Sequence, residues 1–275
     1  MSLPVDLSNI VVCQKLTMVL VSIGTVILTL EDLTKYKTFK DTELLSWEVS
    51  SLSYPWMTNR VLNWILHYFC AYSRYKYLMI AKLVSALLII SLAFIAHNII
   101  LSVLLFIATV SSLSLNIRNP FGTDGSHQMS IIVYSCLFLS SIAEEQSLGQ
   151  QLCFWFIAIQ SVLSYFVAGV YKLISTSWQN GKALVGIFST DIYGNQWVYD
   201  LLRNRPHWSK ACSWMIIAYE CMFPVVLLVD LNFMILILLT GFLFHLSSAI
   251  FMSLNIFLWM FIATYPSIIY CSTNL

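Results

Sequence analysis

The chain has 275 residues, of which 59% are hydrophobic and only 10% are charged, and its formal net charge is +1. Soluble domains carry about 25% charged residues, so this composition excludes an ordinary soluble protein and predicts an integral membrane protein. The small net charge gives no electrostatic reason to expect a nucleic-acid partner. The apolar runs are long and continuous, which excludes the alternating strands of a membrane β-barrel and predicts helices, whose backbone groups are satisfied within each segment.

In chain order, the apolar runs predict an all-α, polytopic bundle of about eight transmembrane helices, because a span needs about 20 apolar residues. The expected spans are residues 10–30, 77–96, 98–117, 128–145, 151–174, 211–229, 232–252 and 254–272. The last two runs are nearly contiguous, so they can equally form one bent element.

Two polar segments separate these spans, at residues 31–76 and 175–210. Both mix Trp and Tyr with charged residues, a composition that favours the interface between lipid and water. We expect short interfacial helices and loops there. With no repeat and no Pro/Gly-rich linker, the chain reads as a single transmembrane domain over residues 1–275.

Basic residues in the connecting segments all follow odd-numbered spans. They are Lys35, Lys37, Lys40, Arg60, Arg74, Lys76, Arg118, Lys182, Arg203, Arg205 and Lys210. The rule that Lys and Arg stay on the cytoplasmic side predicts that these segments face the cytoplasm and that both termini lie outside.

Ionisable residues within spans are costly, and they often mark functional sites. Five stand out here: Lys15, Lys82, Lys172, Glu220 and His245. Lys15 and Lys82 lie near the ends of their expected spans, so we interpret both as lysines whose stems reach to the interface by snorkelling.

Lys172 lies on one helical face with three other residues, since side chains three or four positions apart share a face. The face consists of Ser161, Tyr165, Ala168 and Lys172. Gly169 beside it permits close approach of another backbone or a ligand. A buried lysine can act as a base. The alternatives are snorkelling near Trp178 and a structural ion pair.

Glu220 and His245 are the other two candidates. Pro224 follows Glu220 by four residues, so we expect its ring to kink the helix at the carboxyl group. Glu220 would then line a cavity, remain protonated or pair with Lys172. His245 is either a proton relay or a neutral histidine that is bonded to a serine or a backbone carbonyl.

A polar loop at residues 119–129 precedes the fourth expected span and contains Asp124 and His127. Asp124 is suited to capping the helix that follows. The alternative places Asp124 and His127 at the mouth of a site. No pattern in the chain predicts a metal site.

The segment IQSVLSYFVAGVYKLISTSWQNGKAL (159–184) resembles the membrane domain of vitamin K-dependent gamma-glutamyl carboxylase and of its bacterial relatives, the horizontally transferred transmembrane (HTTM) proteins. The residues that carry the resemblance are Tyr165, Phe166, Ala168, Gly169, Lys172, Leu173, Trp178, Gly181 and Ala183. Residues 244–271 are similar to the family's later His-containing helix, and RNPFGTDGSHQM (118–129) is similar to the bacterial, SdpB-like branch.

The resemblance implies that Lys172 is the base that starts oxygenation of a vitamin K-like hydroquinone, the implied cofactor. In the carboxylase this reaction generates a strong base, which removes a proton from a peptide glutamate before carbon dioxide adds. Residues Tyr165, Gly169, Trp178, Glu220 and His245 would then line the pocket, with His127 and Asp124 as further candidates.

Two departures favour the SdpB-like branch over a glutamyl carboxylase proper. The family's two adjacent lysines are Tyr171 and Lys172 here, and we expect no counterpart of the carboxylase's large soluble domain. The implied function is maturation of a small secreted antimicrobial peptide in a bacterial plasma membrane. The alternatives are the carboxylase reaction itself and a non-enzymatic membrane partner for export of, or immunity to, a hydrophobic peptide.

Overall fold

The computed structural model describes residues 9–40, 43, 46–54, 59–120 and 124–275, and throughout these ranges the regular secondary structure is helical. Seven helical segments of the described chain are long and apolar enough to cross a membrane. They are α1 (Ile10–Thr34), α4 (Tyr72–Leu92), α5 (Asn98–Arg118), α7 (Leu148–Ile174), α11 with η2 (Pro206–Leu227), α12 (Leu231–Met252) and α13 with α14 (Asn255–Thr273). The expectation of an all-α, polytopic membrane protein is confirmed.

The fourth expected span is present as helix α6 (Gly125–Ile142), but this helix is not one of the seven. Its first turn carries Ser126, His127 and Gln128, which lower its mean hydropathy. The membrane-crossing role of α6 therefore stays a prediction.

Local backbone chemistry explains where the later helices stop. Ser253 ends α12 in a left-handed conformation, with a φ of 58°, so the last two apolar runs form separate helices rather than one bent element. Pro224 follows the end of α11 at Met222 and lies in a 3-10 segment, η2 (Phe223–Leu227). We expected a kink at Glu220, but this residue lies within α11, and the structure instead changes helix type three residues later, at Phe223. Proline cannot donate the hydrogen bond that continues an α-helix.

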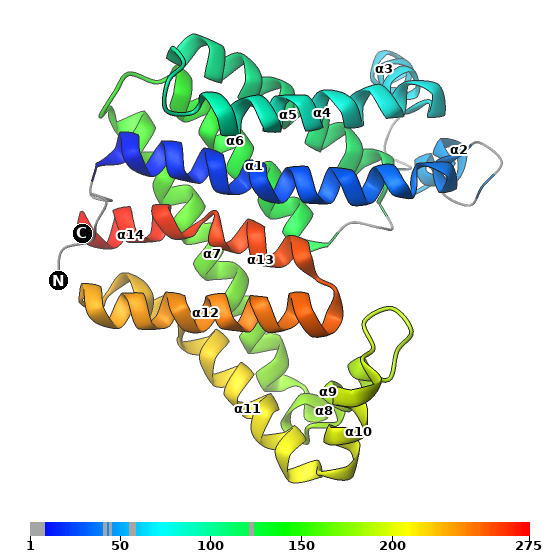
Figure 1. The fold of residues 1–275 in the computed structure, drawn as a ribbon, viewed down its shortest axis with the longest axis vertical. Coiled ribbons are helices and arrows are strands. Elements are labelled where there is room, and N and C mark those ends of the chain that lie inside the picture. Colours follow the sequence, from blue (N-terminus) through cyan, green and yellow to red (C-terminus); the bar gives the residue numbers. More distant parts are fainter. Residues whose placement is uncertain (1–8, 41–42, 44–45, 55–58, 121–123) are drawn as a thin grey trace. The chain divides into compact units, whose positions relative to one another are not determined.

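The chain forms two compact units, which we describe separately. The N-terminal unit contains Ile10–Cys153 and the C-terminal unit contains Phe154–Leu275, with α7 running across the division. In the N-terminal unit α1, α4, α5 and α6 form a closed ring of packed neighbours, in the order α1–α4–α5–α6–α1 (Figure 1). The short elements η1 (Tyr36–Phe39), α2 (Trp47–Ser51) and α3 (Arg60–Cys70) pack against α1, α4 and α5.

In the C-terminal unit, α12 packs against α13, α14 and η2. The short helices α8 (Thr176–Gln179), α9 (Lys182–Phe188) and α10 (Gln196–Asn204) pack around α11, and Figure 1 shows α7 and α11 converging on them. Short helices therefore occupy parts of both polar segments, as the sequence predicts.

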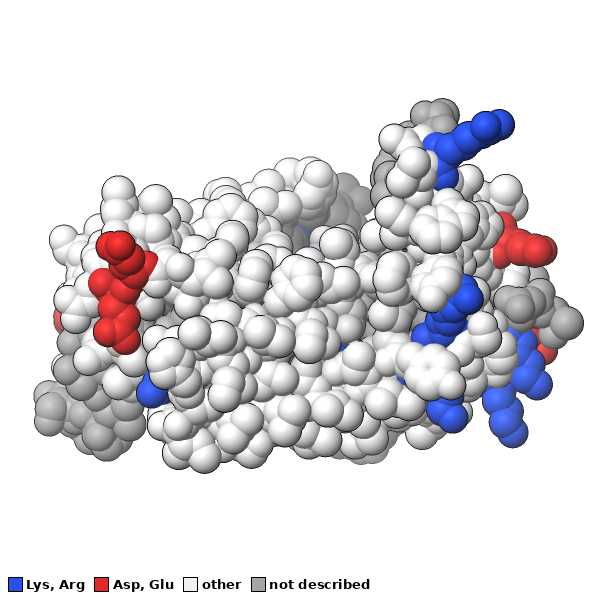
Figure 2. Space-filling model, turned by 90° about the horizontal axis from the view of Figure 1, so that it is seen from above, with Lys and Arg blue, Asp and Glu red and all other residues white. Residues whose placement is uncertain are grey.

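The α5 helix illustrates why the N-terminal ring suits a lipid environment. Its inner face buries Leu101, Leu105 and Ala108, whereas large apolar side chains at Ile99, Val103, Phe106, Ile107 and Val110 are exposed. On the face drawn in Figure 2, charged side chains gather towards the ends and a broad uncharged band lies between them. An apolar outer surface of this extent requires an apolar surrounding, which supports association with a lipid membrane.

Arg118, counted above among the loop residues, is the last residue of α5 and is completely buried. Its guanidinium group donates hydrogen bonds to the backbone oxygens of Cys70 at 2.9 Å and Phe39 at 3.1 Å, and to the hydroxyl of Ser50 at 3.4 Å. One side chain thereby ties η1, α2 and α3 to the end of α5.

We predict that Arg118→Met lowers the free energy of unfolding by about 3 kcal/mol, because it leaves buried carbonyl groups without a donor. Arg60→Met is the matched control, since Arg60 is exposed at the first residue of α3. Unfolding of both variants is measured by denaturant titration in detergent micelles. Equal stability of the two variants would contradict an anchoring role for Arg118.

Candidate functional site

An ion pair between α7 and α11 is the centre of the candidate site. Lys172 Nζ lies 2.8 Å from Oε1 and 2.7 Å from Oε2 of Glu220. The Glu220 side chain is 5% exposed and that of Lys172 is 19% exposed. The ion pair, one of the alternatives that the sequence left open for these two residues, is formed.

Gly169 explains why α7 and α11 come close enough to make this pair. A Cβ atom added at Gly169 would lie 2.7 Å from the backbone nitrogen of Cys221 and 2.9 Å from the carbonyl carbon of Glu220. Small residues at such crossings let helix backbones touch. Lys172 is one turn further along α7, where its side chain reaches the Glu220 carboxyl group.

Trp178 is also part of the site. Lys172 Nζ lies 5.2 Å from the centre of the Trp178 ring, within the range of a cation–π interaction. Trp178 belongs to α8, which packs against α11. The lysine is therefore held by one group on α11 and one on α8.

Tyr165 and His245 form a second buried contact. The tyrosine hydroxyl lies 2.7 Å from Nε2 of His245, and the two residues are 3% and 4% exposed. The Tyr165 ring stacks on Phe223 at a centroid distance of 3.8 Å, and His245 stacks on Phe261 at 4.6 Å. The partner of His245 is thus a tyrosine, and the expected serine or backbone partner is wrong.

Two further tyrosines were missed in the sequence. Hydroxyl groups of Tyr165, Tyr219 and Tyr265 all lie close to the position that a Cβ atom of Gly241 would occupy. Tyr219 donates to the backbone oxygen of Ile237 at 3.2 Å. The Tyr265 hydroxyl is buried and interacts with the hydroxyl of Tyr165. Both tyrosines lie in apolar runs, where an aromatic residue carries no distinct functional signal.

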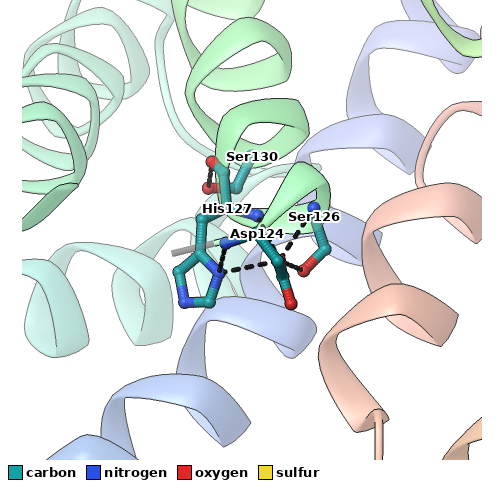
Figure 3. A network of polar contacts seen from close by, with 4 residues as sticks. All are labelled: Asp124, Ser126, His127 and Ser130. Carbon is teal, nitrogen blue, oxygen red and sulfur yellow. Dashed lines mark hydrogen bonds and ion pairs between the residues drawn. The ribbon is translucent and has the colours of Figure 1, made fainter. Parts of the chain in front are cut away.

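Asp124 and His127 belong to the N-terminal unit, where they cap α6 (Figure 3). The Asp124 carboxylate accepts backbone hydrogen bonds from Ser126 at 2.9 Å and His127 at 3.3 Å, and its Oδ1 lies 2.9 Å from His127 Nδ1. Burial by itself would raise the pKa of Asp124, but hydrogen bonds from His127 and Ser126 outweigh burial and hold the pKa below its ordinary value. The predicted capping role is confirmed.

The snorkelling interpretation of Lys82 is wrong. Lys82 is 3% exposed and lines a small internal cavity. The physical reason is the start of α4 at Tyr72, five residues before the expected start, which moves Lys82 from the end of the helix into its interior. Lys15 lies in the second turn of α1, is partly exposed, and has its Nζ 5.8 Å from the ring centre of Phe94.

Comparisons of the chain with protein-family models, with curated proteins and with solved structures find no significant match.

We predict that Gly169→Ala destabilises the protein by about 1–3 kcal/mol, because the added methyl group meets backbone atoms that cannot move independently. Gly186→Ala is the matched control, since a Cβ atom at Gly186 has no neighbour within 4 Å. Thermal unfolding in detergent is the measurement. Equal midpoints for the two variants would show that α7 and α11 do not touch at Gly169.

We further predict that Asp124→Ala costs about 1 kcal/mol of stability at neutral pH through loss of the helix cap. Because the folded state depresses the pKa of Asp124 below 3.8, the carboxylate's contribution is complete above that pH and is lost as pH falls through the folded value. The stability difference between wild type and Asp124→Ala should therefore shrink in acid. Asp124→Asn, which still caps but cannot ionise, should keep its stability at neutral pH and show a weaker acid dependence.

Proposed function

We propose that this chain is a membrane-embedded enzyme, in a bacterial plasma membrane, that matures a small secreted peptide. Lys172 acts as the base and Glu220 exchanges a proton with it. The observation that carries the proposal is the contact of one lysine amine with both oxygens of a carboxyl group that is 5% exposed. The resemblance to the HTTM family, SdpB-like branch, and its lysine adds the reaction class.

The ion pair supplies a route to a neutral lysine, which is the form that acts as a base. Transfer of a proton from the Lys172 ammonium to the Glu220 carboxylate breaks an N–H bond and forms an O–H bond, and the net charge of the pair does not change. Two charges in an apolar interior carry a desolvation cost that the neutral pair avoids. The Lys172 amine is then free to accept a proton from a substrate group.

Aromatic side chains near the pair are the feature that supports the hydroquinone that the resemblance implies. Aromatic rings of Tyr165, Phe223 and Trp178 provide flat apolar faces, and Tyr165 stacks directly on Phe223. The buried hydroxyl of Tyr265 lies with those of Tyr165 and Tyr219 beside Gly241. A bound hydroquinone would supply the reducing electrons for an oxygenation, while the neutral Lys172 amine accepts a proton from the substrate and Glu220 keeps the proton that it took from the lysine.

A second candidate is a non-enzymatic membrane partner for the export of, or immunity to, a hydrophobic peptide. The observation that favours it is that Glu220 already accepts from Lys172 with both oxygens, next to the Gly169 crossing. Such a pair stabilises α7 against α11 without any substrate. In this case the amine has a structural role only.

A charge-swapped pair separates the two candidates. The wild type, the neutral double variant Lys172→Met/Glu220→Met and the swap Lys172→Glu/Glu220→Lys are each co-expressed with small secreted peptides encoded beside the gene. The double variant is used because a single Lys172→Met change would leave Glu220 buried without a partner, at a cost of about 3–5 kcal/mol. Peptide masses are compared by mass spectrometry.

We expect a peptide mass change with the wild type that is absent with both variants, although both are folded. A base needs its amine at the position of Lys172, whereas a structural pair works in either orientation. An export or immunity function that the swapped pair restores, without any mass change, would favour the non-enzymatic partner. A mass change that survives in the neutral variant would refute Lys172 as the base.

A further inference from the structure

A small internal cavity lies among α1, α4, α5 and α6 of the N-terminal unit. Its volume is about 40 Å³. The polar residues that matter here are Asp32, Lys82, Ser112, Asn116, Asn119 and His127. They come from all four helices of the ring and from Asn119, the residue directly after α5, so the tertiary fold alone brings them together.

Three atoms at this cavity are buried and lack a hydrogen-bond partner among the described residues. They are Ser112 Oγ, Asn116 Nδ2 and Asn119 Oδ1. Each unsatisfied group of this kind costs about 1–3 kcal/mol, and bound water is the usual way of satisfying it. At roughly 10–15 Å³ for each water, the cavity has room for about three.

Opposite charges face the same space. Lys82 on α4 is 3% exposed, and Asp32 on α1 is partly buried. Within the described residues, the Lys82 amine has no carboxylate oxygen within the 4.0 Å of a direct ion pair. Because both groups line one cavity, water that fills it would bridge the ammonium to the carboxylate.

His127 connects this cavity to the surface. Its Nδ1 lies 2.9 Å from the Asp124 carboxylate, and Figure 3 shows the other ring nitrogen directed away from Asp124. The His127 side chain is 20% exposed and that of Asp124 is 34% exposed. An imidazole can receive a proton at one nitrogen and release a proton from the other, so its position between a partly buried carboxylate and a cavity suits relay.

We propose that Asp32, Lys82 and the water between them form a proton-transfer site, which exchanges protons with solvent through Asp124 and His127. One proton binds at the Asp124 side of the imidazole, and another leaves the opposite nitrogen for the cavity water. The water passes a proton to the Asp32 carboxylate, where an O–H bond forms. One proton moves inward, and nothing is oxidised or reduced.

Charged and titratable groups face this site from each helix of the ring. They are Asp32, Glu31 and Lys35 from α1 and the residue that follows it, Lys82 and Tyr75 from α4, Arg118 from α5, and Asp124 and His127 at the start of α6. The number of protons bound at the site depends on all of these groups together. The site shares no residue with the Lys172–Glu220 pair, so its tests are independent of the proposed function.

Hydroxyl-radical footprinting of the wild type in lipid nanodiscs tests for the water. Tyr75 lines the cavity and is 2% exposed, whereas Tyr134 on α6 is 0% exposed and is hydrogen bonded to Ser22 and Thr25. Internal water should make Tyr75 label several-fold faster than Tyr134. If both tyrosines stay equally unlabelled, the cavity holds no exchangeable water and the proposal is overturned.

Infrared spectroscopy after a pH jump tests the proton path in the same nanodiscs. A carboxyl band that Asp32→Asn removes should follow the jump in the wild type. His127→Gln should keep the band's amplitude but slow its appearance by about 100-fold, the contribution expected of a positioned proton carrier. Glutamine at this position retains a capping box with Asp124, so the helix start is preserved.

Absence of the Asp32-dependent band in the wild type would overturn the site. An unchanged rate in His127→Gln would overturn the path. If His127→Gln does not fold, Asp124→Asn replaces it, because it keeps the cap while removing the outer titrating group. The same slowing is then expected, and an unchanged rate again refutes the path.

Discussion

A charged side chain in an apolar interior loses its hydration, and this cost must be offset by polar partners. The buried charged groups of this protein each have such surroundings. The Lys172 amine is bound to both oxygens of Glu220. The Arg118 guanidinium is wrapped by backbone carbonyls. Lys82 faces a polar cavity rather than lipid. An ionisable side chain in a span is costly unless such partners are provided. Each of these three residues therefore requires a particular neighbouring segment to lie beside it.

Arg118 and the Lys172–Glu220 pair have different roles. Arg118 stabilises the short helices at the end of the N-terminal ring, and its role is structural. The Lys172–Glu220 pair depends on Gly169, because only the missing side chain lets α7 reach the backbone of α11. The pair therefore joins the two helices, and it is also the group to which we assign the proposed chemistry. Its proton can move without creating net charge, which is the property that connects packing to the proposed reaction.

Much of the candidate site was predictable from residue spacing. Tyr165 and Lys172 were expected on one helical face, and both turn inward in the C-terminal unit. The capping of α6 by Asp124 was also predictable, because an Asp before a helix has a local hydrogen-bonding role. Lys82 was misread because a shift of five residues in the start of α4 changes a terminal lysine into an interior one. Tyr219 and Tyr265 were missed because aromatic residues in apolar runs carry no distinct signal.

The sequence by itself determined the class of protein, since a chain with 59% hydrophobic residues in long runs has only helices available to it in lipid. It also determined which ionisable residues are costly and which residues share a helical face, because helical periodicity is local. Only the tertiary structure decided the partners: Glu220 for Lys172, Tyr165 for His245, and the common cavity of Asp32 and Lys82. The first two pairs join residues that are 48 and 80 positions apart in the sequence. No local pattern encodes a contact across such a separation.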